Sequence, residues 1–125
     1  MISSENKENI KRLGCVIGDN DLLNNVMNSL EKGESKLFES AEVGCVIIKP
    51  VFRDGDIGML VWVAISSSRD AIKTYLPFFE NLAKDTDMKF MQFKTKRRGF
   101  RRFIKQFNFI ESRPSDGFFV FEKEV

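Results

Sequence analysis

The residues best suited to chemistry form a basic cluster between positions 94 and 105. Its seven cations stand in a stretch that holds no acid: Lys94, Lys96, Arg97, Arg98, Arg101, Arg102 and Lys105. The whole chain has a net charge of +2, so the residues outside the cluster sum to +2 minus 7, or −5. Guanidinium and ammonium groups bind phosphates and carboxylates through charge-assisted hydrogen bonds. The cluster therefore predicts contact with an anion.

Four interpretations of the basic cluster stay open. Its cations could bind nucleic-acid phosphates, dock on an acidic protein surface, contact the phosphates of a coenzyme, or form only a solvated face. The interleaved phenylalanines recur at helical spacing on the opposite side, which argues against stacking on bases. Binding of nucleic acid or of a protein partner would fall to Arg98, Arg101, Arg102 and Lys105.

Composition excludes several other chemistries. The chain has no histidine, which removes Ser-His-Asp and Cys-His catalysis and every His-ligated metal site. Two cysteines, Cys15 and Cys45, are too few for a disulfide scaffold or a four-thiolate zinc site. We therefore expect no metal, and we interpret both cysteines as buried thiols of a reducing compartment.

Length and hydropathy indicate one globular domain over residues 1–125. The chain is 42% hydrophobic and 30% charged, and no apolar run approaches the roughly 20 residues that cross a bilayer. The first seven residues lack the apolar stretch of a secretion signal. These features predict a cytoplasmic protein without membrane contact.

The spacing of apolar residues predicts the elements that position the cluster. It indicates helices over about 4–13, 20–33, 69–85 and 97–107, and strands over 43–52, 57–65, 88–96, 108–113 and 118–123. The order α-α-β-β-α-β-α-β-β is that of an α+β (mixed α/β layer) fold. A helical part, 1–33, would precede a sheet core, 43–125. The unbroken apolar run around Trp62 predicts a central strand that is covered on both faces.

A heptapeptide at the end of the last predicted helix carries a family resemblance. Its residues, Phe103-Ile104-Lys105-Gln106-Phe107-Asn108-Phe109, are similar to the signature F-Y-E-K-L-G-F of the GNAT superfamily of N-acetyltransferases. A hairpin and an aromatic last strand, 117–123, follow as they do in that family. The resemblance covers about residues 57–125 and implies a GNAT-like central mixed sheet flanked by helices.

The resemblance implies a site for acetyl-coenzyme A between the strands 57–65 and 88–96. In the family, a glycine-rich turn and the following helix bind the pyrophosphate. The equivalent turn here reads Ser66-Ser67-Ser68-Arg69-Asp70-Ala71 and has no glycine, so three serines that only cap a helix are the alternative. The implied coenzyme contacts are Ser66, Ser67, Ser68, Arg69, Lys96, Arg97 and Arg98.

The resemblance does not supply catalytic residues. Ile104 stands where many members of the family have a proton-donating tyrosine, and Tyr75 lies in the apolar stripe of another helix. Four carboxylates are equivalent candidates for a general base: Glu39, Glu42, Asp54 and Asp56.

Two functions follow from the resemblance. One is a coenzyme A-dependent N-acyltransferase with a degenerate coenzyme turn and an unknown acceptor. The other is a catalytically silent, GNAT-like bacteriophage accessory protein for the virion, head assembly or genome delivery. That protein would act in a bacterial host cell or virion, as a homo-oligomer or part of a larger assembly, by binding protein or nucleic acid through the basic helix.

Overall fold

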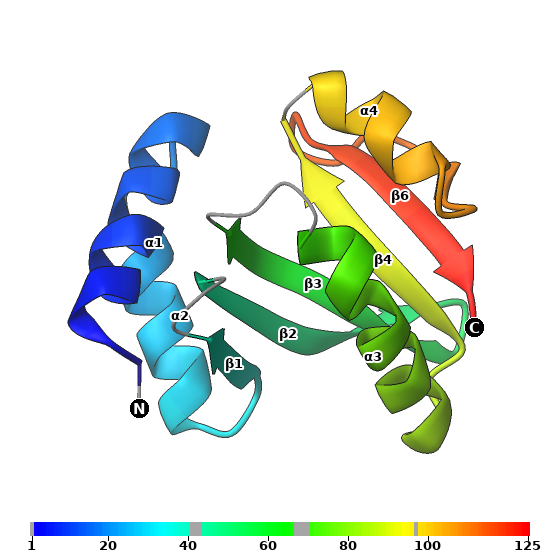
Figure 1. Ribbon diagram of the computed structural model, residues 1–125, viewed down its shortest axis with the longest axis horizontal. Coiled ribbons are helices and arrows are strands. Elements are labelled where there is room, and N and C mark those ends of the chain that lie inside the picture. The colour runs from blue at the N-terminus through cyan, green and yellow to red at the C-terminus, as the bar shows by residue number, and fades with distance from the viewer. Residues whose placement is uncertain (1, 41–43, 67–70, 97) are drawn as a thin grey trace. The chain divides into compact units, whose positions relative to one another are not determined.

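Six strands and four helices make up the described residues of the computed structural model, which are 2–40, 44–66, 71–96 and 98–125 (Figure 1). None of these helices combines the length and the apolar content that crossing a bilayer requires. The elements are α1 (Ser4–Ile17), α2 (Leu22–Glu31), β1 (Lys36–Ser40), β2 (Gly44–Arg53), β3 (Asp56–Ser66), α3 (Ala71–Asp85), β4 (Phe90–Thr95), α4 (Arg98–Lys105), β5 (Ile110–Glu111) and β6 (Phe119–Glu124).

The strands form one mixed sheet in the order β1-β2-β3-β4-β6-β5. β3 and β4 run parallel, whereas β1 pairs with β2, and β6 with both β4 and β5, in antiparallel register. The predicted α+β fold with a central mixed sheet is confirmed, and β3 is an inner strand as its apolar run predicts. The prediction lacked β1, because its five residues contain only two large apolar side chains, Leu37 and Phe38.

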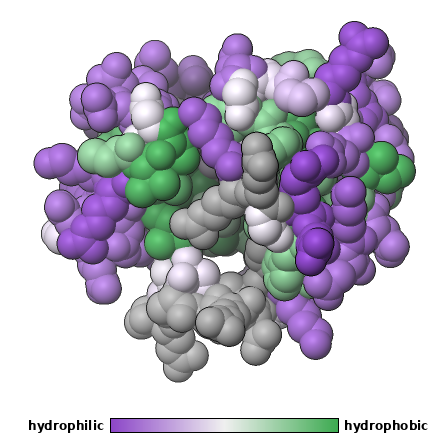
Figure 2. Space-filling model, turned by 90° about the horizontal axis from the view of Figure 1, so that it is seen from above, coloured by the Kyte–Doolittle hydropathy of each residue, from purple (hydrophilic) through white to green (hydrophobic). Residues whose placement is uncertain are grey.

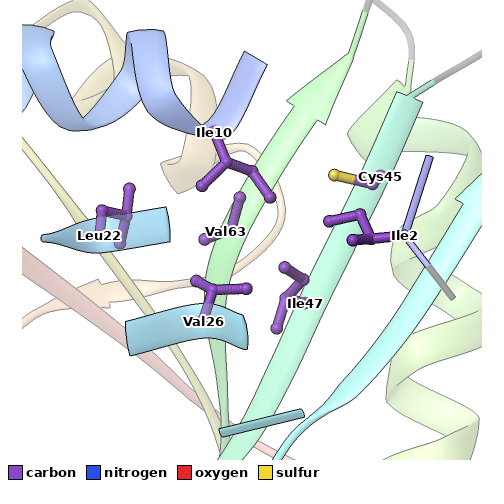
Figure 3. Packing of buried hydrophobic residues seen from close by; sticks show 7 residues of the cluster. All are labelled: Ile2, Ile10, Leu22, Val26, Cys45, Ile47 and Val63. Atoms are coloured by element: carbon purple, nitrogen blue, oxygen red, sulfur yellow. The ribbon is translucent and has the colours of Figure 1, made fainter. Parts of the chain in front are cut away.

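The chain divides into two compact units, each of which has its own core. The first contains Met1–Lys49 and Trp62–Thr74, and the second contains Pro50–Val61 and Tyr75–Val125. In the first unit, apolar side chains from the N-terminal segment, both helices and two strands meet in one cluster (Figure 3). Its buried members are Ile2, Ile10, Leu22, Val26, Cys45, Ile47 and Val63. A single domain over 1–125 stays a prediction.

The ends of α1 differ from the predicted ones. The Ser3 hydroxyl accepts a hydrogen bond from the Asn6 backbone N–H, so Ser3 is the N-cap of this helix. The helix continues through Gly14 and ends at Gly18, whose φ of 78° is the left-handed conformation that glycine adopts at helix ends. Gly14 has a packing role instead, because a Cβ there would lie 2.5 Å from the Asp19 carbonyl oxygen.

Aromatic side chains form much of the second core. Phe93 on β4 contacts the rings of Phe100 and Phe109 at centroid distances of 5.8 and 5.2 Å, and Phe100 also contacts Phe121 of β6. Phe93 and Phe121 are directly paired in the antiparallel register of β4 and β6, so both lie on the same face of the sheet. The amphipathic helix α4 covers that face with its apolar side, as its sequence predicts.

Other local expectations agree with the structure in part. The helix predicted over 69–85 is α3, which contains Pro77. The strand predicted over 108–113 is reduced to β5, and Asn108 before it has a positive φ of 69°. Cys45 is buried as predicted, but Cys15 is exposed on α1.

Gly58 gives β3 the space for its closest side-chain neighbour. It is paired with Phe90 in the parallel register, and the Phe90 ring occupies the position that a side chain would need. A Cβ on Gly58 would lie 2.4 Å from two atoms of this ring, and Phe90 is fully buried. A side chain at position 58 therefore requires the buried Phe90 ring to shift.

We expect Gly58→Ala to lower the free energy of unfolding by about 1–3 kcal/mol, because overpacking forces buried groups apart. Urea unfolding measures this loss. Gly99→Ala is the matched control, since a Cβ on Gly99 meets no atom within 4 Å and alanine favours a helix by up to about 1 kcal/mol. In a Phe90→Leu background the effect of Gly58→Ala should shrink, and an undiminished effect would contradict the assigned contact.

Candidate functional site

The parallel pairing of β3 and β4 is short. Its register covers four pairs, from Gly58↔Phe90 to Val61↔Phe93, and ends there. β3 itself continues to Ser66 and β4 to Thr95. Because parallel strands run in the same direction, the residues that follow the last register pair lie at the carboxyl end of the ladder; on β4 these are Lys94 and Thr95.

In the first unit, the end of β3 is packed closely against the start of β2. Gly44 has a φ of 113°, and a Cβ on it would lie 2.2 Å from the Ile65 carbonyl oxygen. The Trp62 ring is only half-buried, contrary to the expected full burial, and the Lys49 ammonium lies 3.7 Å from its centroid. Both contacts fix the backbone of β3 up to its last residue, Ser66.

Only part of the implied coenzyme site lies within the described residues. Ser66 is exposed at the end of β3, whereas Ser67, Ser68, Arg69 and Arg97 lie outside the described residues. Lys96 follows β4, is exposed, and holds its ammonium 4.9 Å from the centroid of the Phe118 ring. Arg98 is the first residue of α4.

The remaining cations of the basic helix differ in their contacts: Arg101 is bound to an acidic residue, whereas Arg102 and Lys105 are more accessible. The Arg101 guanidinium donates hydrogen bonds of 2.9 and 3.1 Å to the two carboxylate oxygens of Glu111 and lies 4.8 Å from the centroid of Phe119. The Lys105 ammonium is 3.8 Å from the same carboxylate, and Arg102 is exposed. Arg101 therefore fastens α4 to β5 and β6.

The candidate proton-transfer residues are not gathered at the carboxyl edge. Ile104 is fully buried, and Tyr75 is half-buried on α3. Asp54 is a turn residue with a φ of 50°, and Asp56 begins β3, so both lie at the amino end of the strand. Glu42 lies outside the described residues.

Glu39, the remaining candidate base, has a structural partner. Its carboxylate accepts hydrogen bonds from the Asn6 side-chain amide at 2.7 Å and from the Ser3 backbone N–H at 3.0 Å. These bonds, the one from Asn6 first, lower the pKa of Glu39. A carboxylate that is held ionised in this way is a weaker base and serves to attach α1 to β1.

Burial, and then the charge of Glu39, raise the pKa of the neighbouring Cys45 to about 11, so this thiol is unreactive at neutral pH.

An ionic network that the sequence analysis missed covers Phe90. Arg53 donates hydrogen bonds of 2.9 Å to Glu122 and 2.8 Å to Glu124, and its guanidinium carbon lies 4.0 Å from the Phe90 centroid. The bonds to Glu124 and Glu122 raise the pKa of Arg53. Gln92 donates a further bond of 2.8 Å to Glu122. The alternation of 119–124 places both glutamates on one strand face, but only the fold brings Arg53 to them.

A shallow hollow of about 460 Å³ lies beside this network in the second unit. Ile110, Ser112 and Asn108 line it together with Arg53 and both glutamates. Its acids already have basic partners, so the hollow presents no unpaired charge to a ligand. The described residues also contain no group of three acidic or cysteine side chains that could hold a metal ion.

Two solved structures are similar to this chain in fold. The first is a GNAT-family acetyltransferase from Listeria monocytogenes, with a TM-score of 0.69 and 19% identity over 97% of this chain and 86% of that one. The second is the PaiA N-acetyltransferase from Thermoplasma acidophilum in complex with coenzyme A, with a TM-score of 0.55 and 17% identity over 100% and 81% of the two chains. No family model and no curated protein matches the sequence. The chain thus has the GNAT fold, which confirms the fold that the heptapeptide implied.

The hydrogen bonds between the Glu39 carboxylate and α1 make the stability of the fold depend on pH. A carboxylate whose pKa is lowered on folding stabilises the fold above its unfolded pKa, and this contribution disappears as the pH falls through the folded pKa. Glu39→Gln should therefore lower the melting temperature at pH about 7 and make little difference at pH about 3. Thermal unfolding at both pH values measures this, with Glu8→Gln on the exposed side of α1 as control. An equal deficit at both pH values would contradict the charge-based role.

Proposed function

We propose that this protein is a coenzyme A-dependent N-acyltransferase that works by positioning its substrates. The observation that carries the proposal is the GNAT fold with a parallel β3–β4 ladder of only four pairs. The coenzyme A bound to the structurally similar PaiA N-acetyltransferase supports an acyl-coenzyme A as the donor here.

The proposed reaction forms an amide from an amine and a thioester. The amine nitrogen bonds to the acyl carbon, the carbon–sulfur bond breaks, and the proton that the amine loses passes through water to the released thiol. Lys96 after β4 supplies a cation for the phosphates of the donor. Holding two reactants in a productive geometry accelerates transfer even without an acid or a base.

Thermal unfolding with acetyl-coenzyme A tests the binding step. At 100 times its dissociation constant, a ligand adds about 2.7 kcal/mol to the free energy of unfolding, so the melting temperature should rise. ADP is the matched control ligand, because it has the adenine and pyrophosphate groups without the pantetheine arm. No shift with acetyl-coenzyme A, or an equal shift with ADP, would contradict a site for the whole coenzyme.

Lys96→Gln should weaken acetyl-coenzyme A about tenfold, because a charged hydrogen bond to phosphate contributes about 1.4 kcal/mol. Lys11→Gln, which removes an exposed charge from α1, should leave the affinity within twofold. Isothermal titration measures both. If the two variants bind equally well, Lys96 does not contact the coenzyme.

The pH dependence of transfer distinguishes positioning from general base catalysis. Without a protein base, only the neutral acceptor amine reacts, so the rate with a lysine-like amine should rise steadily with pH toward the amine's own pKa of about 10. Initial rates with acetyl-coenzyme A measure this profile. A rate that reaches a plateau near pH 7 would reveal a protein base. If acetyl-coenzyme A binds but no acyl group is transferred, the protein binds the coenzyme without being an acyltransferase.

A further inference from the structure

The exposed side of α4 presents a concentrated positive charge that the proposed reaction does not use. This α4 basic face consists of Arg101, Arg102 and Lys105, with 41% of the Arg101 side chain and 54% of the Lys105 side chain exposed. The opposite side of the helix is apolar and includes the fully buried Ile104. Figure 2 shows that hydrophilic residues cover much of the surface in that view.

The acids of the structure neutralise this face only in part. Glu111 is the one carboxylate within 4 Å of its cations in the described part of the chain, and Arg101 and Lys105 share it at 2.9 and 3.8 Å. Arg102 forms no ion pair with any described residue.

The charges of this face have opposing effects on the helix. Arg102 and Lys105 lie in the last turn, where cations favour the helix dipole, and Arg101 is paired with Glu111. Like charges three or four residues apart, such as Arg102 with Lys105 and Arg101 with Lys105, each destabilise a helix by a few tenths of a kcal/mol. An external anion would remove this repulsion and would neutralise the exposed Arg102.

The surroundings of the face favour a phosphate polymer over a protein. The centre of a protein interface is enriched in apolar and aromatic side chains. None of the large exposed hydrophobic residues of the described chain lies on α4, and the nearby rings of Phe118 and Phe119 are half-buried beside Lys96 and Arg101. The large exposed hydrophobic residues are Val16, Phe52, Ile57, Phe78 and Ile110. Phosphate binding needs only cations, and the guanidinium fork of arginine matches phosphate geometry.

Two half-buried rings extend the face toward the end of β4. Phe118 and Phe119 are neighbours at the start of β6, with the Lys96 ammonium 4.9 Å from the first ring and the Arg101 guanidinium 4.8 Å from the second. The rings hold these two side chains close to the protein surface, so Lys96 adds its charge beside the helix. A chain of phosphates along α4 would meet several cations within about 12 Å, the length of an eight-residue helix.

We propose that the α4 basic face binds the phosphate backbone of single-stranded nucleic acid without reading its sequence. A single strand is favoured because a flexible backbone can follow a short convex helix, whereas a duplex is stiff over this length. Contacts of arginine and lysine with phosphates carry no sequence information. This inference is independent of acyl transfer, since Arg102 and Lys105 take no part in the proposed coenzyme contacts.

Fluorescence anisotropy with a labelled oligothymidylate of about 20 nucleotides tests the proposal on the full chain. At roughly 50 mM salt we expect binding, with a salt slope of about −0.7 for each phosphate contact. Arg102→Gln/Lys105→Gln should weaken binding at least tenfold and reduce the slope by about 1.4. The melting temperature of this variant should change little, because the loss of the contact between Lys105 and Glu111 and of the dipole interaction offsets the relief of like-charge repulsion.

Lys11→Gln/Arg12→Gln is the matched control, because it removes one lysine and one arginine that are exposed on α1. It should leave the affinity within twofold. Equal weakening by the two variants, no binding at low salt, tighter binding of a duplex, or equally tight binding of a poly-glutamate peptide would each overturn the proposal. The affinity for acetyl-coenzyme A should not change in Arg102→Gln/Lys105→Gln, so failure of one proposal is distinguishable from failure of the other.

Discussion

The parallel pairing of β3 with β4 is the constraint on which the rest of the second unit depends. Four register pairs hold the two strands together, and the first of them places the Phe90 ring in the space left by Gly58. Arg53 then covers the ring and joins it to Glu122 on β6. The short β3–β4 ladder is thus stabilised by the packing of the Phe90 ring, by the Arg53 cation above it and by the hydrogen bonds of Arg53.

A site with few reactive groups suits chemistry that depends on placement. The signature position that holds a tyrosine in many GNAT proteins is here the buried Ile104, and Glu39 is occupied in holding α1. Acyl transfer between an activated thioester and an amine does not require either group, provided that the reactants are aligned. The fold is therefore compatible with acyl transfer. Because no described side chain is placed to remove a proton, the rate of transfer should depend on the fraction of the acceptor amine that is unprotonated.

Local patterns were sufficient to predict most elements, whereas contacts between distant residues were not predictable. Helical spacing identified α4, and continuous apolarity identified β3 as an inner strand. β1 was missed because Lys36–Ser40 is short and partly polar, so that its pairing with β2 decides its conformation. The ion pair of Arg53 with Glu122 joins residues 69 positions apart, and no sequence period reports such a contact. The basic cluster was evident from composition, but only the structure shows that Glu111 neutralises part of it.

Backbone amide spectra of the labelled protein, recorded during a titration with coenzyme A, test the central claim most directly. We expect the signals of Lys94–Lys96 to shift in a saturable way, because these residues follow the last pair of the ladder. The signals of the Asp54–Asp56 turn, at the amino end of β3, should stay in place. Unchanged spectra at saturating coenzyme, or shifts confined to the turn, would contradict a coenzyme site at the carboxyl edge of β3 and β4.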